Sequence, residues 1–115
     1  MDSLDEWIAA LQATPKLILV EGKNDEAALR DHDITNVRVI VGIPLYRVVE
    51  EVARTTKEVI VLTDLDKEGR RWYGKLRHAL QARGVKIDTQ FREFLLRRTT
   101  LTHIEGLAHY LRRTL

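Results

Sequence analysis

Short apolar runs typical of strands alternate along this chain with segments in which apolar residues recur at helical spacing. Runs of aliphatic residues, rich in β-branched Val and Ile, occupy positions 17–20 and 59–62 without a break and positions 37–41 with one polar residue, Arg38. Each run has the length of a strand, and the lack of polar alternation is typical of strands buried on both faces. The segment 85–88, Val-Lys-Ile-Asp, predicts a further short strand at or near an edge of the sheet.

Between these runs, apolar residues recur every three or four positions, as on the buried face of a helix. The expected helices cover residues 4–13, 23–32, 44–54, 70–83 and 103–114, with a short helical turn near 91–95. Capping boxes open the first helix at Ser3 and the last at Thr102. Strands that alternate with helices predict an α/β fold, a compact Rossmann-like parallel sheet of about four to five strands with helices on both faces.

Length and composition limit the class of protein. The 115 residues suffice for one domain with a core of its own, so we expect a single domain over 1–115. No apolar run approaches the roughly 18 residues of a membrane span, and the N-terminus lacks the pattern of a signal peptide. The chain has no cysteine, which excludes disulfides and thiolate metal sites. These features favour a cytoplasmic protein with no membrane association.

The net charge of +2 conceals an asymmetry between the two halves of the chain. Residues 1–66 hold 7 Lys and Arg against 13 Asp and Glu, a balance of −6, whereas residues 67–115 hold 12 against 4, a balance of +8. The basic C-terminal half favours an anionic partner. A solvated basic surface without a partner is the alternative.

Carboxylates follow two of the predicted strands directly. Glu21 comes after the run at 17–20, and Asp64 and Asp66 come after the run at 59–62. Ligands of open α/β sheets bind at the carboxyl ends of the strands. If these two strands are neighbours, the three acids converge at one end of the sheet, where an aspartate pair suits Mg²⁺. Taken alone, Asp-x-Asp after a strand is as compatible with a turn or a helix cap.

Converging acids repel one another, so either a divalent cation or a raised pKa on one of them is expected. A glutamate of raised pKa can move a proton, while a cation held by Asp64 and Asp66 steadies the charge on a phosphate. This combination predicts phosphoryl-transfer chemistry. Glu21 has an alternative interpretation as a loop carboxylate that hydrogen-bonds to the N-terminus of the next helix.

Two motifs together resemble a known family. Residues 20–25 read Val-Glu-Gly-Lys-Asn-Asp, and residues 63–69 read Thr-Asp-Leu-Asp-Lys-Glu-Gly. Their order, strand contexts and spacing resemble the two-part signature of the Toprim domain, over about residues 16–90. That domain is shared by topoisomerases of types IA and II, bacterial primases, OLD-type nucleases, recombination-repair proteins and the ribonuclease that matures 5S ribosomal RNA. The first motif looks closest to this ribonuclease and to small stand-alone Toprim proteins, and the second also resembles type IA topoisomerases.

The resemblance implies a Toprim fold, with Glu21 as general acid/base and with Asp64 and Asp66 holding Mg²⁺, for which Mn²⁺ can substitute. Glu68 falls where some members carry a third acid, which makes it a lesser metal candidate. Position and charge alone predict further contacts to phosphate or nucleic acid, from Lys23, Lys67, Arg70 and Arg71. His103 and His109 are six residues apart, which is not the spacing of a zinc pair, so neither is given a metal role.

The favoured function is Mg²⁺-dependent phosphodiester chemistry on RNA or DNA, most readily as a nuclease, with RNA processing as one form of it. The alternative is a nucleic-acid-binding or complex-forming Toprim module without turnover. A phosphatase or receiver-type domain that uses Asp64 as phospho-acceptor is less favoured. A receiver domain usually has two acids after its first strand, whereas glycine follows Glu21 here, and a phosphatase resembling the haloacid dehalogenases usually has Thr or Val after Asp-x-Asp, where this chain has Lys67. The topoisomerase gate and the primase zinc module have no counterpart in the sequence, so the part that holds the substrate is expected to be missing or to be supplied by a protein partner or a second copy of the chain.

Overall fold

The sheet contains four parallel strands in the part of the chain that the structure, a computed structural model, describes, residues 1–107. These strands are β1 (Leu17–Val20), β2 (Val37–Val39), β3 (Glu58–Val61) and β4 (Lys86–Asp88). Their order is β2-β1-β3-β4, and every neighbouring pair is parallel. The predicted α/β class is confirmed. The strand predicted from the segment 85–88 lies at an edge of the sheet, as expected.

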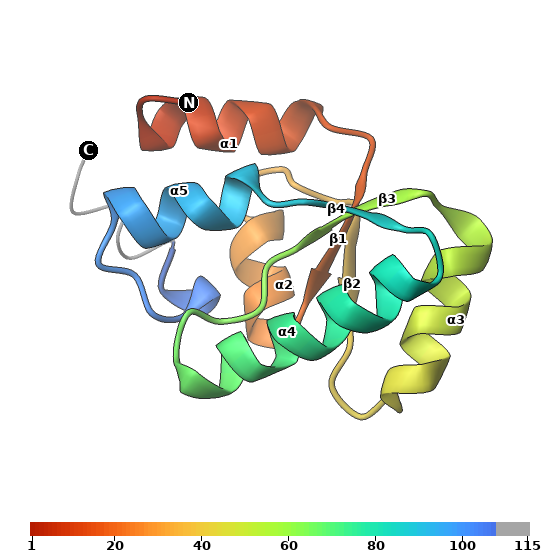
Figure 1. The fold of residues 1–115 in the computed structure, drawn as a ribbon. Coiled ribbons are helices and arrows are strands. Elements are labelled where there is room, and N and C mark those ends of the chain that lie inside the picture. The colour runs from red at the N-terminus through yellow and green to blue at the C-terminus, as the bar shows by residue number, and fades with distance from the viewer. Residues whose placement is uncertain (108–115) are drawn as a thin grey trace.

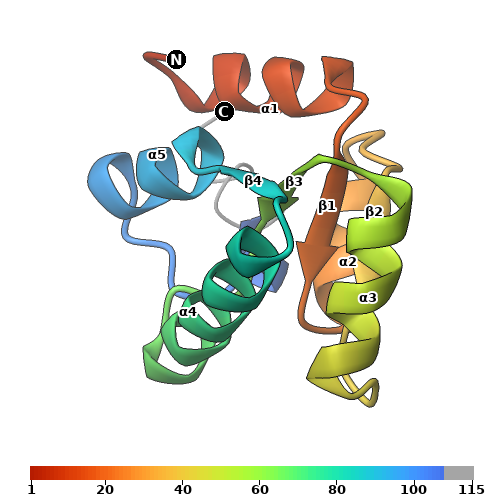
Figure 2. The ribbon, with the colours of Figure 1, turned by 45° about the vertical axis from the view of Figure 1, so that its right-hand side comes forward.

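Helices cover both faces of the sheet (Figures 1 and 2). One face carries α1 (Leu4–Ala13), α2 (Lys23–Arg30) and α5 (Gln90–Arg98), and the other carries α3 (Leu45–Thr55) and α4 (Lys67–Ala82). A 3₁₀ turn, η1 (Ile104–Gly106), follows α5 and packs against α2. The chain thus forms three layers, with the sheet in the middle.

Alternate residues of the two central strands, β1 and β3, supply two separate cores, which explains why the runs at 17–20 and 59–62 are apolar throughout. Ile18 and Val20 point to the core under α1, α2 and α5. Leu19 and Val61 point to the core under α3 and α4. Because side chains of a strand alternate between its faces, a strand covered on both sides must be apolar at every position.

Trp7 anchors the N-terminal helix. Its side chain is fully buried, its indole N–H donates to the carbonyl oxygen of Phe91 at 2.9 Å, and the two rings meet edge to face with centroids 6.1 Å apart. Ser3 caps the same helix, since its hydroxyl accepts from the amide of Glu6 at 3.1 Å. The predicted bounds and capping residue of this helix are both confirmed.

Several boundaries differ from the prediction, and four of the differences concern helix ends. The turn near 91–95 is a full helix, α5. The α4 helix begins before Gly69, because the Asp66 side chain accepts from the Gly69 amide at 2.8 Å and caps the helix there. Pro44 precedes α3 as its N-cap and is not its first helical residue. Thr102 does not cap the last helix: its hydroxyl lies 3.0 Å from Nδ1 of His103, and most of the predicted 103–114 helix lies outside the described residues.

Lys16, just before β1, forms ion pairs with Glu58 on β3 and Asp88 on β4. Replacing Lys16 should therefore lower the free energy of unfolding. Its ammonium lies 2.8 Å from Asp88 and 3.2 Å from Glu58. Although burial opposes it, hydrogen bonds from Lys16 and Gln90 hold the pKa of Asp88 below its usual value of 3.8. A lowered folded-state pKa contributes stability above the unfolded pKa that is lost as the pH falls. We expect Lys16→Met to cost about 1–2 kcal/mol at pH 7, with the difference from wild type shrinking below pH ~4.

Urea unfolding at pH 7 and at pH ~3.5 measures this difference. Lys57→Met is the matched control, because Lys57 is an exposed lysine just before β3 that forms no ion pair with any of residues 1–107. The control should unfold like the wild type at both pH values. A Lys16→Met penalty that is equally large at both would contradict the assignment to the Asp88 ion pair.

Candidate functional site

The strand order reverses between β1 and β3. From β1 the chain crosses to β2 on one side, and it then returns to form β3 on the other side. Open parallel sheets form a crevice at the carboxyl ends of the strands at such a reversal. Glu21 directly follows β1. Pairing continues past β3, because the amide of Leu62 donates to the carbonyl oxygen of Leu19 at 2.8 Å, which carries Thr63 and Asp64 into the same crevice.

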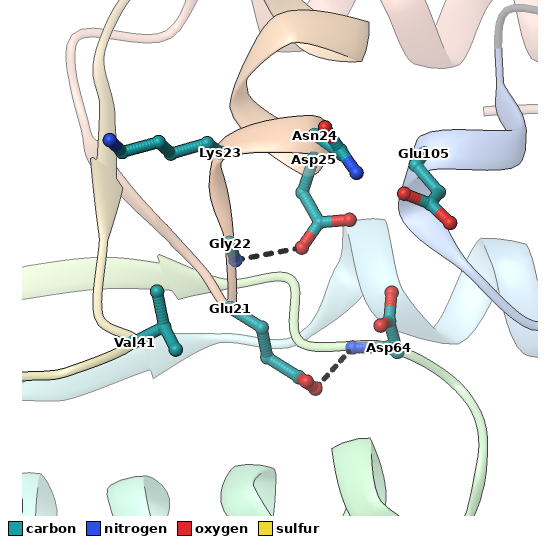
Figure 3. A pocket seen from close by; sticks show the side chains of 8 residues that line it. All are labelled: Glu21, Gly22, Lys23, Asn24, Asp25, Val41, Asp64 and Glu105. Atoms are coloured by element: carbon teal, nitrogen blue, oxygen red, sulfur yellow. Dashed lines mark hydrogen bonds between the residues drawn. The ribbon is translucent and has the colours of Figure 1, made fainter.

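The acids at these two strand ends are held together by backbone hydrogen bonds. The amide of Asp64 donates to Oε1 of Glu21 at 2.9 Å (Figure 3). Asp25, in the first turn of α2, is 5% exposed, and its Oδ2 accepts from the amide of Gly22 at 2.9 Å. In Figure 3 the Asp64 carboxylate points toward Asp25 and Glu105. A cavity of about 320 Å³ opens among them, lined by Glu21, Gly22, Lys23, Asn24, Asp25, Val41, Asp64 and Glu105.

Burial and mutual repulsion raise the pKa of two carboxyl groups that line this cavity. Desolvation raises the pKa of Glu21, and the charges of Asp64, Asp66 and Asp25 raise it further, against the hydrogen bond from the Asp64 amide. Desolvation likewise raises the pKa of Asp25. A carboxyl group of raised pKa can exchange a proton nearer neutral pH than an ordinary one. The alternative interpretation of Glu21, as a partner of the next helix, does not hold, because Asp25 takes that place.

His103 completes a group of metal-binding side chains. Its Nε2 lies 3.1 Å from Oδ2 of Asp66, and donor atoms of Asp64, Asp66 and His103 all lie within 4.8 Å of one another. Two carboxylates with one imidazole fit a divalent cation, since carboxylates suit Mg²⁺ and Mn²⁺ and imidazole suits later first-row metals. Asp66 therefore serves as a helix cap through Oδ1 while its Oδ2 remains directed at the candidate metal position.

The other residues predicted for the site lie around this centre and not within it. Glu68 is exposed on the first turn of α4 and is not part of the Asp64–Asp66–His103 group. The side chain of Lys23 extends away from the carboxylates in Figure 3. The remaining predicted phosphate contacts are exposed on the first two turns of α4, namely Lys67, Arg70 and Arg71.

Arg92 on α5 fixes the loop that carries the aspartates. It is 3% exposed, its guanidinium donates to the carbonyl oxygen and hydroxyl of Thr63, and it donates to the Asp64 carbonyl oxygen at 3.0 Å. The guanidinium also lies 4.5 Å from the ring centroid of Tyr73 on α4. Burial lowers the pKa of Arg92, and the nearby charges of Glu21 and Asp64 counter that effect. Arg92 thus holds the loop through the carbonyl oxygens of Thr63 and Asp64, and the Asp64 carboxylate is not one of its hydrogen-bond acceptors.

The segment after α5 closes the loop from the other side. The amide of Leu65 donates to the carbonyl oxygen of Thr102 at 2.8 Å, and the amide of Ile104 donates to Oδ1 of Asp64 at 2.8 Å. These two bonds place His103, which lies between the bonded residues, beside Asp66. Sequence patterns gave no indication of this docking, nor of the roles of Arg92 and His103. Asp25 is part of the first motif, and its burial and its bond to the Gly22 amide are seen only in the structure.

The arrangement of motifs on this fold decides the family. A model of the Toprim domain matches residues 16–94. This chain belongs to the Toprim domain family. The match covers the whole sheet together with both acidic strand ends, so the resemblance seen in the sequence is confirmed. Family membership also decides against the receiver-type alternative.

Relatives support the same assignment over more of the chain. UPF0292 protein MJ1624 of Methanocaldococcus jannaschii is 32% identical over 109 residues, covering 91% of this chain and 85% of that protein. UPF0292 protein PYRAB04740 of Pyrococcus abyssi is 38% identical over 79 residues, covering 68% of this chain and 59% of that protein. A solved structure of a protein from Aquifex aeolicus matches with a TM-score of 0.86 and 37% identity, covering 92% of this Toprim chain and 99% of that one.

Within residues 1–107, none of the helices has both the length and the apolar character needed to cross a membrane. The names of these relatives state no activity.

Proposed function

We propose that this Toprim protein is a divalent-metal-dependent enzyme that cleaves phosphodiester bonds of nucleic acid. The observation that carries the proposal is the juxtaposition of two groups at the β1–β3 crevice. Asp64, Asp66 and His103 offer donor atoms within 4.8 Å of one another. Next to them stands Glu21, a carboxyl group of raised pKa that is hydrogen-bonded to the backbone of Asp64.

Each side chain has a distinct part in this chemistry. Asp64, Asp66 and His103 would hold the cation, which supplies Lewis-acid stabilisation of charge on a phosphate oxygen when it is bound. Glu21 moves the proton: its Oε1 accepts from the Asp64 amide, so Oε2 is available to a water molecule or to the leaving oxygen. Arg92 acts through the backbone and keeps Thr63 and Asp64 in place.

The first turns of α4 supply positive charge beside the acids. Lys67, Arg70 and Arg71 follow Asp66 directly and are exposed. Arginine pairs with phosphate oxygens through two parallel hydrogen bonds, and lysine through a point charge. The substrate backbone would lie along these residues, with the reacting phosphate at the carboxylates. Lys23 would have to swing round from its position in Figure 3 to join them.

Incubation of the purified chain with labelled single-stranded and duplex RNA and DNA tests the proposal. Cleavage is expected with Mg²⁺ or Mn²⁺ and should stop on chelation with EDTA. Glu21→Gln should retain metal binding, measured by calorimetry, and lose about 10²–10⁴-fold in cleavage rate, the range typical of a general acid or base. Cleavage that persists in EDTA would show that the activity does not arise from this site.

A nucleic-acid-binding module without turnover is the second candidate, and the exposed basic turns of α4 favour it. The same assay separates the two functions. Binding without cleavage under every metal condition would support the module. In that case the affinity should fall with salt, by roughly 0.7–0.9 powers of ten per tenfold rise in salt for each phosphate contact.

His103 gives a prediction about metal preference that does not depend on turnover. Because imidazole suits later first-row metals better than it suits Mg²⁺, His103→Ala should weaken Mn²⁺ binding about 10- to 100-fold and Mg²⁺ binding less. Titration calorimetry with each metal measures both affinities. His78→Ala is the matched control, because His78 is an exposed histidine on α4 outside the Asp64–Asp66–His103 group. Equal losses for the two metals would exclude a direct ligand role for His103.

A further inference from the structure

A second hollow lies beside the acidic cavity, and Glu21 and Val41 line both of them. It has a volume of about 170 Å³, and its lining consists of Glu21, Ile40, Val41, Gly42, Glu68 and Trp72. Apart from the two glutamates its walls are apolar or glycine, in contrast to the carboxylate-lined cavity on the other wall of Glu21. Sites for small organic groups have this character, mostly apolar with a few polar groups that fix orientation.

Val41 is exposed in this hollow and is nevertheless held in place. Its side chain is 65% exposed, yet its amide donates to the Glu21 carbonyl oxygen at 2.9 Å, and the amide of Ile40 donates to Val20 at 3.0 Å. The backbone pairing of β2 with β1 therefore extends to the rim of the hollow. Gly42 then turns the chain away with φ of 79°, a conformation that favours glycine. The apolar rim at Ile40 and Val41 is thus tied by hydrogen bonds to the end of β1.

Trp72 supplies the aromatic part of the lining, and it lies within a basic stretch of α4. It is half-buried, it lies one turn after Glu68, and the Lys75 ammonium is 5.8 Å from the centroid of its ring. Exposed Arg71 lies next to it in the chain. Surfaces that bind single-stranded nucleic acid combine aromatic side chains, on which bases stack, with basic side chains that track the phosphates.

We propose that this hollow binds one unpaired nucleobase of the substrate, next to the phosphate that lies at Glu21. That the ligand is a nucleobase rests on the proposed function, whereas its position follows from the lining of the hollow. The base would stack between Trp72 and Val41, the Glu68 carboxylate at the rim can accept from an exocyclic amino group, and Lys75 and Arg71 face the flanking phosphates. A base within a duplex is stacked and paired and cannot enter, so the site selects single-stranded or frayed nucleic acid.

Intrinsic fluorescence provides the test, because the chain has only two tryptophans and Trp7 is fully buried. The measurement titrates oligothymidylate and oligoadenylate of about 12 nucleotides in EDTA and low salt. We expect the wild type to be quenched by both strands and Trp72→Phe, which leaves only Trp7, to show no quenching. By anisotropy, Trp72→Ala should bind the single strands about 5- to 150-fold more weakly.

Two controls make the result specific. Tyr46→Ala removes another exposed aromatic side chain, 67% exposed and outside the lining of the hollow, and should bind like the wild type. A blunt duplex of the same length should give no quenching, and its affinity should be equal for the wild type and Trp72→Ala. Trp72→Phe keeps a stacking ring in the hollow and should retain most of the affinity even if the alanine variant is unstable.

The inference is overturned if Trp72→Ala binds single strands within twofold of the wild type, if the duplex quenches as strongly as the single strands, or if no oligonucleotide binds. Because binding is measured in EDTA, the outcome is separate from catalysis. Quenching without cleavage in the metal assay would support base binding in the hollow and exclude nuclease activity. Cleavage without any effect of substitutions at Trp72 would support nuclease activity and exclude base binding in the hollow.

Discussion

Asp64→Asn is expected to reduce metal-dependent cleavage by at least about a hundredfold without unfolding the protein. Loss of a residue that merely supports a metal ligand typically costs 10–100-fold in affinity or activity, and loss of a charged ligand should cost more. The asparagine can still accept the hydrogen bond that Ile104 donates to Oδ1, so the loop keeps its position. Rates of cleavage in Mn²⁺ and calorimetric metal binding measure the loss.

The same variant should leave a distinct signature in the metal-free protein. The charge of Asp64 contributes to the raised pKa of Glu21, so Asp64→Asn should move the titration of the Glu21 carboxyl group to lower pH in carbon-detected NMR. Thermal stability in EDTA should be equal to or above that of the wild type, because repulsion among the carboxylates is reduced. Asp5→Asn, on the exposed side of α1, is the control and should change neither property. Wild-type cleavage by Asp64→Asn would falsify the assignment of the site.

Gly69→Ala is expected to destabilise the fold by at least about 3 kcal/mol, at or beyond the upper end of what overpacking usually costs. A Cβ at this position would lie 1.9 Å from the Asp64 carbonyl oxygen and 2.4 Å from its carbonyl carbon. Both are backbone atoms, and Arg92 holds that carbonyl in place. The α4 helix would have to move away from the loop, which would break the bond from the Thr63 hydroxyl to the Gly69 carbonyl oxygen at 2.7 Å.

Gly74→Ala provides a control of opposite sign on the same helix. No atom lies within 4 Å of a Cβ at Gly74, which is exposed in the middle of α4, so alanine there should add about 0.5–1 kcal/mol through helix propensity. Urea unfolding of both variants measures the pair. A Gly69→Ala variant within about 1 kcal/mol of the wild type would mean that the close contact between α4 and the Asp64 loop is not rigid.

The sheet and the acidic strand ends could be predicted because their signals are local. Runs rich in Val and Ile are typical of buried strands. Glu21 directly follows one of them, and Asp64 follows another after Thr63. Whether those two strands are neighbours is not a local property, and the paired motifs supplied it through the family. The start of α4 was misplaced because Gly69 looks like a helix breaker, whereas its lack of a side chain serves the close approach to Asp64.

The rest of the site depends on contacts between residues far apart in the chain, which no short pattern encodes. Arg92 reaches a carbonyl oxygen 28 residues before it, and Ile104 reaches a carboxylate 40 residues before it. His103 was discounted for its spacing from another histidine, although its partner is Asp66. The capping box at Thr102 was misleading because that hydroxyl turns to the His103 ring and leaves the helix end without a side-chain cap.

The docking of residues 102–104 on the Asp64 loop has a consequence for biosynthesis. A ribosome completes the four strands and both aspartates well before it adds His103 and Ile104. Until residues 102–104 dock, the Leu65 amide and Oδ1 of Asp64 lack the partners that this segment supplies. The candidate centre is complete only when this late segment has been added, so a chain halted before residue 102 should lack the full metal-binding group.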